Sequence, residues 1–176
     1  MESLRQFLDR HQPLARWQEE WLGVPLTFSL ALSEDLPPRS YIASVRALVL
    51  HGEDVLVVHS SPPILTVGGR REPDETVEQT LIREVGEESG WVVTPITTIG
   101  FVHVHHLDGQ RPDWARPAPD FVGPIFAAAA VRYDRALLHD NETRCEFVPI
   151  VDIERLGVDA GNRALLHEAL RRRSQM

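Results

Sequence analysis

Three glutamates in the middle of the chain have a spacing that could hold a metal ion. Glu84, Glu87 and Glu88 stand at positions i, i+3 and i+4, which on an α-helix places their side chains within an arc of roughly 100°. Like charges so placed repel one another, so a helix on an ordinary surface gains no stability from them. A hard divalent cation such as Mg²⁺ prefers oxygen ligands and would turn this repulsion into coordination. The spacing therefore predicts a metal site on one helix face.

The flanking residues predict the helix that must position these carboxylates. Thr76 and Gln79 form the pattern of a capping box at its start, and Gly90 stands where a left-handed C-cap is expected. Upstream, a short apolar strand ends in a double glycine, Gly68-Gly69, which allows the backbone to approach a ligand closely. The expected order is strand, glycine-rich loop and acidic helix. The apolar arc that would pack this helix on the core is formed by Leu81, Ile82 and Val85.

The stretch from Gly69 to Trp91 resembles the signature of the Nudix hydrolases, G-x5-E-x7-R-E-U-x-E-E-x-G-U, in which U is a bulky apolar residue. The resemblance covers only this stretch directly, and the flanking strands are compatible with it. It implies an α/β fold, an α/β/α sandwich with a mixed β-sheet. It also implies that water attacks a diphosphate linkage, usually in a nucleoside diphosphate joined to a further group X. The matching positions are Gly69, Glu75, Arg83, Glu84, Val85, Glu87, Glu88, Gly90 and Trp91.

The resemblance further implies a role for each residue of the signature. A Mg²⁺ ion, for which Mn²⁺ could substitute, would neutralise charge on the diphosphate and lower the pKa of a bound water. Either Glu87 or Glu88 would also take the proton from the attacking water. Arg83 would pair with Glu75 and hold the loop against the helix. The implied metal ligands are the carboxylates of Glu84, Glu87 and Glu88 and the carbonyl of Gly69.

Four residues, at unspecified positions of the signature or downstream of it, are candidates for further contacts. Arg70 and Arg71 directly follow the double glycine and could bind a substrate phosphate in bidentate fashion, the alternative being a solvated loop. Family members often recruit another acid or base from a loop outside the signature. Glu142 and Glu146, on either side of Cys145, are the candidates for this group, with ordinary surface carboxylates as the alternative.

Histidines and a tryptophan downstream of the signature could contact the substrate. Strand alternation puts His103 and His105 on one face and His106 on the other. The first two could touch the substrate or line an exposed strand face, and a zinc site would need further ligands that are not evident. Trp114, in the proline-rich loop over 107–120, could stack on a nucleobase or pin the loop to the body.

Composition limits the classes of protein and partner. The 176 residues, 43% hydrophobic and 25% charged, are typical of one soluble globular unit. The net charge of -8 argues against DNA as a partner and against action on RNA ends. One cysteine excludes an intramolecular disulfide, and no segment has the length of a membrane span or the pattern of a signal peptide. We therefore expect a cytoplasmic protein without a membrane partner.

We expect residues 1–40 to be an N-terminal helical extension with a connector, and 41–176 to be the Nudix domain, together one globular unit. Leu4, Phe7 and Leu8 mark a first short helix, and Leu14, Trp17 and Trp21 a second. This extension could cover the active site, form a dimer arm or cap the core. Dimerisation is common among similar proteins, but the sequence identifies no interface. Strands are expected at 42–50, 55–59, 64–67, 94–106, 121–133 and 146–150, and a closing helix at 162–173.

The function expected from these features is Mg²⁺-dependent hydrolysis of a small phosphorylated metabolite, a nucleotide by preference. Two other classes stay open. One is a non-catalytic sensing module, which loss of signature carboxylates would favour. The other is an enzyme similar to isoprenoid diphosphate isomerase, which uses the same metal site for another reaction. The region over 106–110 contains neither the proline nor the tyrosine that marks some substrate subfamilies, so the sequence does not identify the substrate.

Overall fold

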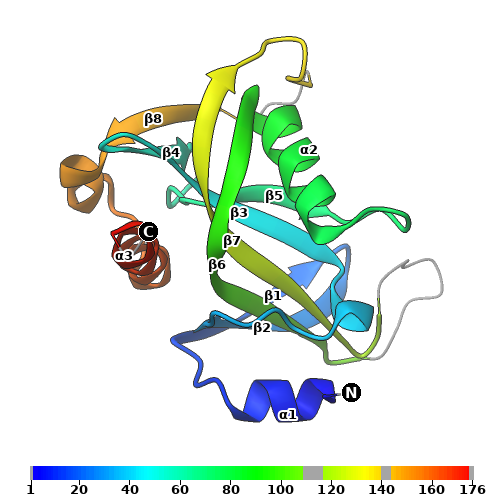
Figure 1. Ribbon diagram of the computed structural model, residues 1–176. Coiled ribbons are helices and arrows are strands. Elements are labelled where there is room, and N and C mark those ends of the chain that lie inside the picture. The colour runs from blue at the N-terminus through cyan, green and yellow to red at the C-terminus, as the bar shows by residue number, and fades with distance from the viewer. Residues whose placement is uncertain (1, 109–116, 140–143, 175–176) are drawn as a thin grey trace.

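A computed structural model describes residues 2–108, 117–139 and 144–174, and in it helices lie on both faces of a mixed, curled β-sheet (Figure 1). The helices are α1 (Leu4–Asp9), α2 (Val77–Ser89) and α3 (Ala160–Arg173), with short 3-10 turns η1 (Arg39–Tyr41) and η2 (Ile150–Leu156). The strands are β1 (Ala15–Trp21), β2 (Val24–Leu32), β3 (Ser44–His51), β4 (Asp54–Val58), β5 (Val67–Arg70), β6 (Trp91–His106), β7 (Asp120–Tyr133) and β8 (Cys145–Pro149).

The sheet has the strand order β1-β2-β6-β7-β3-β4-β8, and β5 pairs with β3 beside this path. Strands β3 and β7 run parallel, whereas the other paired strands run antiparallel. The parallel pair is possible because the signature helix lies in the long connection between β3 and β7. This confirms the predicted mixed sheet.

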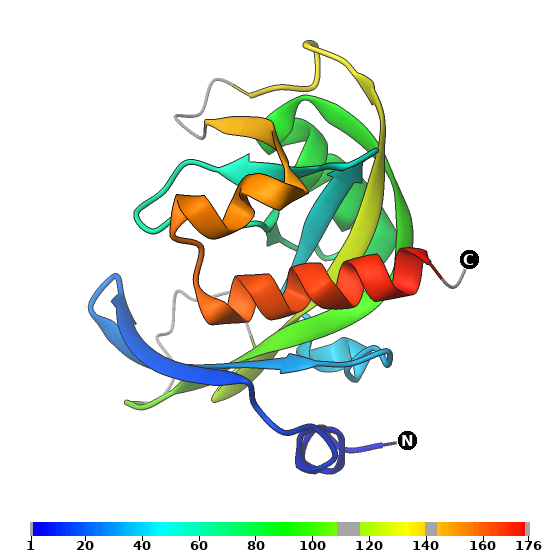
Figure 2. The ribbon, with the colours of Figure 1, turned by 90° about the vertical axis from the view of Figure 1, so that its left-hand side faces the viewer.

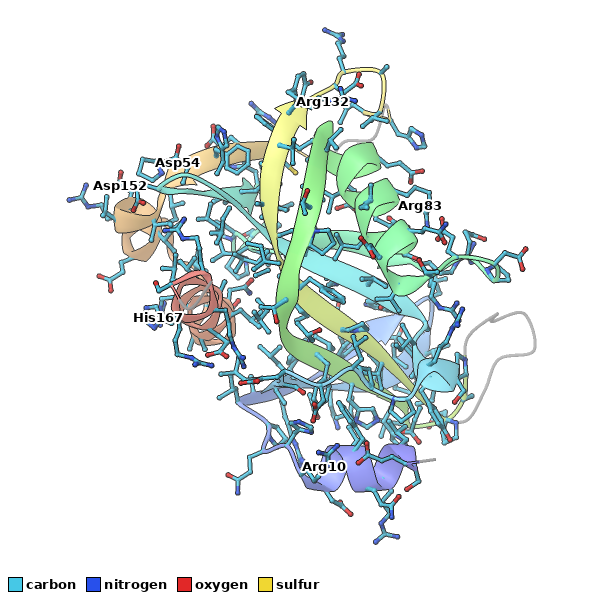
Figure 3. All side chains as sticks on the ribbon, viewed as in Figure 1. Arg10, Asp54, Arg83, Arg132, Asp152 and His167 are labelled. Atoms are coloured by element: carbon cyan, nitrogen blue, oxygen red, sulfur yellow. The ribbon has the colours of Figure 1, made fainter. Side chains whose placement is uncertain are left out.

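Alternate residues of the central strand β3 supply the two faces of the sheet, as the two-residue period of a strand requires. Val45, Ala47 and Val49 pack with α2, through Leu81 and Val85. On the other face, α3 packs on Leu48 and Leu50 through residues that include Leu165, Leu166 and Ala169. Figure 2 shows α3 running across its face of the sheet, and Figure 3 shows Arg83 of α2 and His167 of α3 on opposite sides of it. The predicted α/β/α sandwich is therefore confirmed.

The N-terminal segment differs from the prediction of two helices. The first helix is confirmed as α1, but the second is wrong, because residues 15–21 form β1, which pairs antiparallel with β2. The apolar positions Trp17 and Trp21 also fit a period of two, and aromatic residues favour strands. Leu22 and Gly23, both with positive φ (51° and 74°), make the tight turn of this hairpin. The extension thus adds two strands to the sheet.

Two details of the signature region also differ from the prediction. Gly68 and Gly69 lie inside β5 and not in a loop, since they pair with Arg46 and Val45 of β3. Gly68 has a φ of 142°, and a Cβ there would stand 2.7 Å from the Arg46 Cα, so only glycine permits this approach of the two strands. Ile82, expected in the apolar arc of α2, is 37% exposed. Within the described residues no helix is both long and apolar enough to cross a membrane.

Candidate active site

The ends of α2 fix where its carboxylates stand. The Thr76 hydroxyl accepts a hydrogen bond from the Gln79 N–H at 3.1 Å, and the Gln79 side chain accepts one from the Thr76 N–H at 2.8 Å. This capping box confirms the predicted start of the helix. At the other end Gly90 is left-handed, with φ 73°, which confirms the predicted C-cap. Between these ends the helix places Glu84 and Glu88 against Gly69 and Gly68 of β5.

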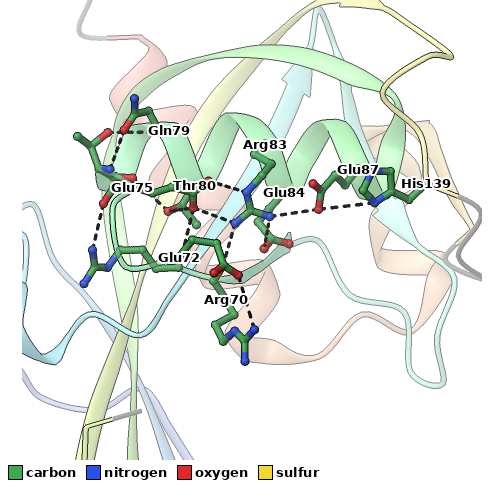
Figure 4. Close-up of polar contacts among 11 residues, drawn as sticks. Arg70, Glu72, Glu75, Gln79, Thr80, Arg83, Glu84, Glu87 and His139 are labelled. Carbon is green, nitrogen blue, oxygen red and sulfur yellow. Dashed lines mark hydrogen bonds and ion pairs between the residues drawn. The ribbon is translucent and has the colours of Figure 1, made fainter. Parts of the chain in front are cut away.

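Arg83 lies at the centre of a group of carboxylates (Figure 4). Its guanidinium donates to both oxygens of Glu75, from Nε at 2.6 Å and from Nη2 at 2.9 Å. Nη1 donates to Glu84 at 2.8 Å and to Glu87 at 3.1 Å. Nη2 also donates to the carbonyl of Arg70 at 3.0 Å, which ties α2 to the end of β5. One guanidinium therefore donates hydrogen bonds to three carboxylates and one backbone carbonyl.

Glu75 accepts more hydrogen bonds than the other carboxylates of this group. Besides the two bonds from Arg83, it accepts hydrogen bonds from the Thr80 hydroxyl at 2.9 Å and the Glu72 N–H at 3.2 Å. The hydrogen bonds from Arg83, followed by those from Glu72 and Thr80, lower the pKa of Glu75 to about 2. The same contacts raise the pKa of Arg83 above its ordinary value. The pair is thus fixed in its charged form.

Glu84 and Glu88 stand in a less favourable environment for a negative charge. Burial raises the pKa of Glu84, and the hydrogen bond from Arg83 only partly opposes it. Burial also raises the pKa of Glu88, against the opposing effects of the Gly68 N–H, which donates to it at 3.2 Å, and of Arg46. Repulsion from Glu87 adds to the shift at both sites. This end of α2 carries more negative charge than its neighbours compensate.

Gly69 brings the backbone of β5 against this carboxylate pair. A Cβ on Gly69 would lie 2.6 Å from the Glu84 Cδ, so any larger residue would push the carboxylate aside. Arg46, on the neighbouring strand β3, interacts electrostatically with both Glu88 and Glu84. Burial lowers the pKa of Arg46, and these two carboxylates oppose the shift. The sequence analysis did not single out Arg46, although an arginine inside an apolar strand is itself a signal.

A cavity of about 590 Å³ opens beside these residues, on the α3 face of the sheet. Gly69, Arg70 and Arg46 line one part of it. Another part is lined by aromatic residues of the first two strands, among them Trp17 and Phe28. A cavity of this size can bury a small molecule. Gly69 links the two features, because it lines the cavity and also touches Glu84.

The two candidate arginines after the double glycine have different surroundings. Arg70 lines the cavity, and its side chain is 57% exposed beside Glu72 at 3.6 Å. Arg71 is turned to the protein, since its Nε donates to the Ile42 carbonyl at 3.0 Å and its Nη1 to the Glu75 carbonyl at 3.0 Å. Arg70 is therefore the one that the structure brings to the cavity.

The two candidate histidines lie away from the cavity. His103 Nε2 and His105 Nδ1 both contact Asp120 Oδ1, each at 2.8 Å. Burial alone would raise the pKa of Asp120, but the hydrogen bonds from His105 and His103 outweigh it and lower the pKa. The cavity is lined by the alternate residues Val102 and Val104, which point to the other face of β6. The histidines therefore contact Asp120 and do not line the cavity.

The candidate acids around Cys145 are partly described. Glu146 pairs with His59 Nε2 at 2.8 Å, next to Ser60 and Ser61, which line the cavity. Burial, with a contribution from Glu88, raises the pKa of the Cys145 thiol to about 11, so this thiol is not a nucleophile at neutral pH. Glu142 and Trp114 lie outside the described residues.

The donor chemistry of α2 fits a hard divalent cation. Within 2–108, 117–139 and 144–174, no three His, Cys, Asp or Glu side chains stand ready to hold a metal ion. The oxygens of Glu84 and Glu87 are instead bonded to Arg83, and that of Glu88 to the Gly68 N–H. Even so, Glu84 and Glu88 lie against Gly69 and Gly68 of β5, where burial and mutual repulsion disfavour their negative charges. A cation bound by these carboxylates would relieve their repulsion.

Comparisons with known proteins find solved structures of similar fold. The pyrophosphohydrolase BsRppH of Bacillus subtilis is 18% identical with a TM-score of 0.56, over 90% of this chain and 96% of that one. A NUDIX hydrolase of Nitrosomonas europaea is 20% identical with a TM-score of 0.51, over 71% and 85%. The NUDIX domain of Shewanella oneidensis NrtR, complexed with ADP ribose, is 17% identical with a TM-score of 0.51, over 77% and 90%. At these identities the likeness shows a common fold.

No curated protein matches the sequence. The sequence-family model of the NUDIX domain, however, matches residues 40–169. This range is most of the chain and includes α2 and the strands around it. The chain belongs to the NUDIX family.

Proposed function

We propose that the protein is a Mg²⁺-dependent hydrolase that cleaves a diphosphate linkage in a nucleoside diphosphate joined to a further group X. Membership of the NUDIX family supports hydrolysis of a pyrophosphate bond. The observation that carries the proposal is the position of the signature carboxylates. Glu84 and Glu88 lie against Gly69 and Gly68, and Gly69 lines the cavity together with Arg46 and Arg70.

The residues that would hold Mg²⁺, or Mn²⁺ in its place, are Glu84, Glu87, Glu88 and the carbonyl of Gly69. When bound, the metal supplies charge neutralisation on the diphosphate and acidifies water. Arg46 and Arg70 bind phosphate oxygens, Arg70 through the planar fork of its exposed guanidinium. Glu75 and Arg83 keep α2 docked to β5, because Arg83 bridges Glu75 and the Arg70 carbonyl.

Proton transfer is assigned to carboxylates. Glu87 or Glu88 accepts the proton of the attacking water at a carboxylate oxygen, a role that requires the carboxylate to lie within hydrogen-bond reach of that water. Glu146, held by His59 next to the cavity wall, is a further acid or base. It stands on a different strand from the signature, so it can approach the substrate from another side.

The class of substrate follows from charge and from one similar structure. A cavity with two arginines at one end suits an anionic group such as a diphosphate. The similar NUDIX domain of Shewanella oneidensis NrtR is complexed with ADP ribose, a nucleotide that contains a diphosphate. We extend this class, a small nucleotide with a diphosphate linkage, to the present chain.

A phosphate-release screen tests the proposal. The purified protein is incubated with nucleoside triphosphates, nucleotide sugars, ADP ribose, dinucleoside polyphosphates and NADH, each with Mg²⁺, with Mn²⁺ and with chelator. We expect metal-dependent turnover of one class, and a loss of orders of magnitude in Glu87→Gln. The matched control is Glu78→Gln, which removes an exposed carboxylate from the first turn of the same helix and should keep full turnover.

Two results would contradict the proposal. Near-normal turnover in Glu87→Gln would remove Glu87 from the assigned ligands. Tight nucleotide binding without turnover of any compound would show a sensing module in place of a hydrolase.

A further inference from the structure

The cavity is made of two chemically different parts. Its charged part, with Arg46, Arg70 and Gly69, lies on β3 and β5. Its aromatic part lies on the N-terminal hairpin, which contributes Trp17 from β1 and Phe28 from β2. The hairpin is therefore part of the cavity wall, and a ligand that fills the cavity must suit both parts.

Trp17 and Phe28 form a stacked pair. They are direct partners in the register of β1 and β2, and their rings lie 5.2 Å apart between centroids with planes only 9° from parallel. Phe28 is buried, at 4% exposure, whereas Trp17 is 40% exposed. One side of the indole is thus covered by Phe28, and the indole still offers open surface to the cavity that it lines. A rigid aromatic surface supported from below is a good stacking platform.

The separation of the two parts matches a molecule with two unlike ends. Strand β1 lies four strands from β3, which is about 19 Å along the sheet at a spacing of ~4.8 Å. The curl of the sheet, visible in Figure 1, makes the direct path shorter. Glu19 also lines the cavity, between Trp17 and Trp21 on the same strand face. Its negative charge disfavours a phosphate at the aromatic end and favours one at the arginines.

We propose that Trp17, supported by Phe28, stacks on the flat heteroaromatic base of the substrate while the diphosphate lies at Arg46 and Arg70. This inference rests on the proposed function, since it takes the substrate to be a nucleotide. It assigns a role to the N-terminal hairpin, which precedes the residues 40–169 matched by the family model. The hairpin is then a specificity element that selects a base, and the carboxylate helix supplies the chemistry.

A binding experiment tests the platform separately from hydrolysis. The probes are the α,β-methylene analogues of ADP and GDP, whose P–C–P bridge resists cleavage, and methylenediphosphonate, which has neither ribose nor base. Affinities are measured by calorimetry with Mg²⁺ present. For each nucleotide analogue, the ratio of its affinity to that of methylenediphosphonate reports the contribution of the nucleoside. Base–aromatic stacking predicts that this ratio falls about five- to hundredfold when the platform is removed.

Two substitutions at one position separate stacking from packing. Trp17→Leu still covers Phe28 with an apolar side chain but offers no aromatic face, so we expect the fall in the ratio. Trp17→Phe keeps a ring in the same place and should retain the ratio within about threefold. Melting temperatures show whether each variant is folded. An unchanged ratio in Trp17→Leu overturns the proposal, as does an equal loss in Trp17→Phe, or a wild-type protein that binds the analogues no better than methylenediphosphonate.

The two proposals fail in different ways. If the ratio falls in Trp17→Leu but no substrate is hydrolysed, the platform stands and the hydrolase assignment fails. If a nucleotide is hydrolysed with Mg²⁺ and the ratio does not change, the hydrolase stands and the platform fails.

Discussion

Helices α2 and α3 each carry a cluster of glutamates and arginines, but the two clusters are balanced differently. On α3, Glu168 accepts hydrogen bonds from Arg171 at 2.6 and 2.8 Å and from Arg172 at 2.8 Å, and Arg172 also pairs with Glu34. Two arginines thus meet two carboxylates. On α2, Arg83 alone donates to three carboxylates, and Glu88 lies beyond its hydrogen bonds.

The surplus of negative charge on α2 explains why its carboxylates behave differently. The hydrogen bonds from Arg171 and then Arg172 lower the pKa of Glu168 to about 2. Burial has the opposite outcome on α2, where it raises the pKa of Glu84 and of Glu88 because no arginine is left to offset it fully. The α3 cluster is complete and contributes to stability. The α2 cluster lacks positive charge, which a bound cation can supply.

The largest expected effect comes from removing one carboxylate of the α2 cluster. We expect Glu88→Gln to lower turnover by a factor on the order of 10² to 10⁴, as the loss of a catalytic carboxylate does. Its melting temperature should equal or exceed that of the wild type, because the fold disfavours the ionised form of Glu88. Steady-state kinetics and thermal unfolding measure the two effects. A large fall in melting temperature would show that the α2 cluster stabilises the fold as the α3 cluster does.

Two adjacent glycines allow effects on the proposed metal site to be distinguished from effects on folding. A Cβ at Gly69 would displace the Glu84 carboxylate, so we expect Gly69→Ala to weaken Mg²⁺ binding about 10- to 100-fold while the protein stays folded. A Cβ at Gly68 would meet the backbone of Arg46 at 2.7 Å, and Gly68→Ala should cost about 2–4 kcal/mol of folding free energy. Metal titration and urea unfolding of both variants measure this. Equal loss of stability in both would refute the distinction.

Glu168→Gln tests the α3 cluster by its pH dependence. The folded pKa of Glu168 is about 2, below its ordinary 4.5, so its stabilisation is complete above about pH 4.5 and is lost as the pH falls towards 2. We expect the variant to be less stable than the wild type by about 1–3 kcal/mol at neutral pH. This difference should shrink as urea unfolding is repeated from pH 5 downwards. Turnover per folded molecule should not change, and a difference independent of pH would contradict the assignment.

The contrast between the clusters also shows what the sequence could predict. Local signals were sufficient for α2: its capping box and its glycine C-cap were confirmed, and its three glutamates lie on the predicted helix. These features lie within one helix and its two ends, so short-range rules of capping and periodicity describe them. The resemblance to the Nudix signature implied that Arg83 would pair with Glu75, and the structure contains this pair.

Features that depend on strand pairing were not predictable in the same way. Trp17 and Trp21 fit the period of a helix and of a strand equally, and only pairing with β2 decides between them. Whether His103 and His105 line the cavity depends on which face of β6 is turned towards α3. The interaction of Arg46 with Glu84 and Glu88 depends on β5 lying beside β3. Each of these requires contacts between residues far apart in the sequence.

The smallest effect on stability is expected at Arg171, because Glu168 pairs with two arginines and loses only one of them. The Arg171 side chain is 49% exposed, and Glu168 keeps the second arginine, Arg172, when Arg171 is lost. Exposed ion pairs contribute little, so Arg171→Ala should leave the stability measured by urea unfolding nearly unchanged. At α2 no second arginine within the described residues donates to the Glu75 carboxylate, so Arg83→Ala should lower stability distinctly more. Equal costs for the two substitutions would mean that surplus carboxylates do not distinguish the helices, and the case for a cation at α2 would lose its physical basis.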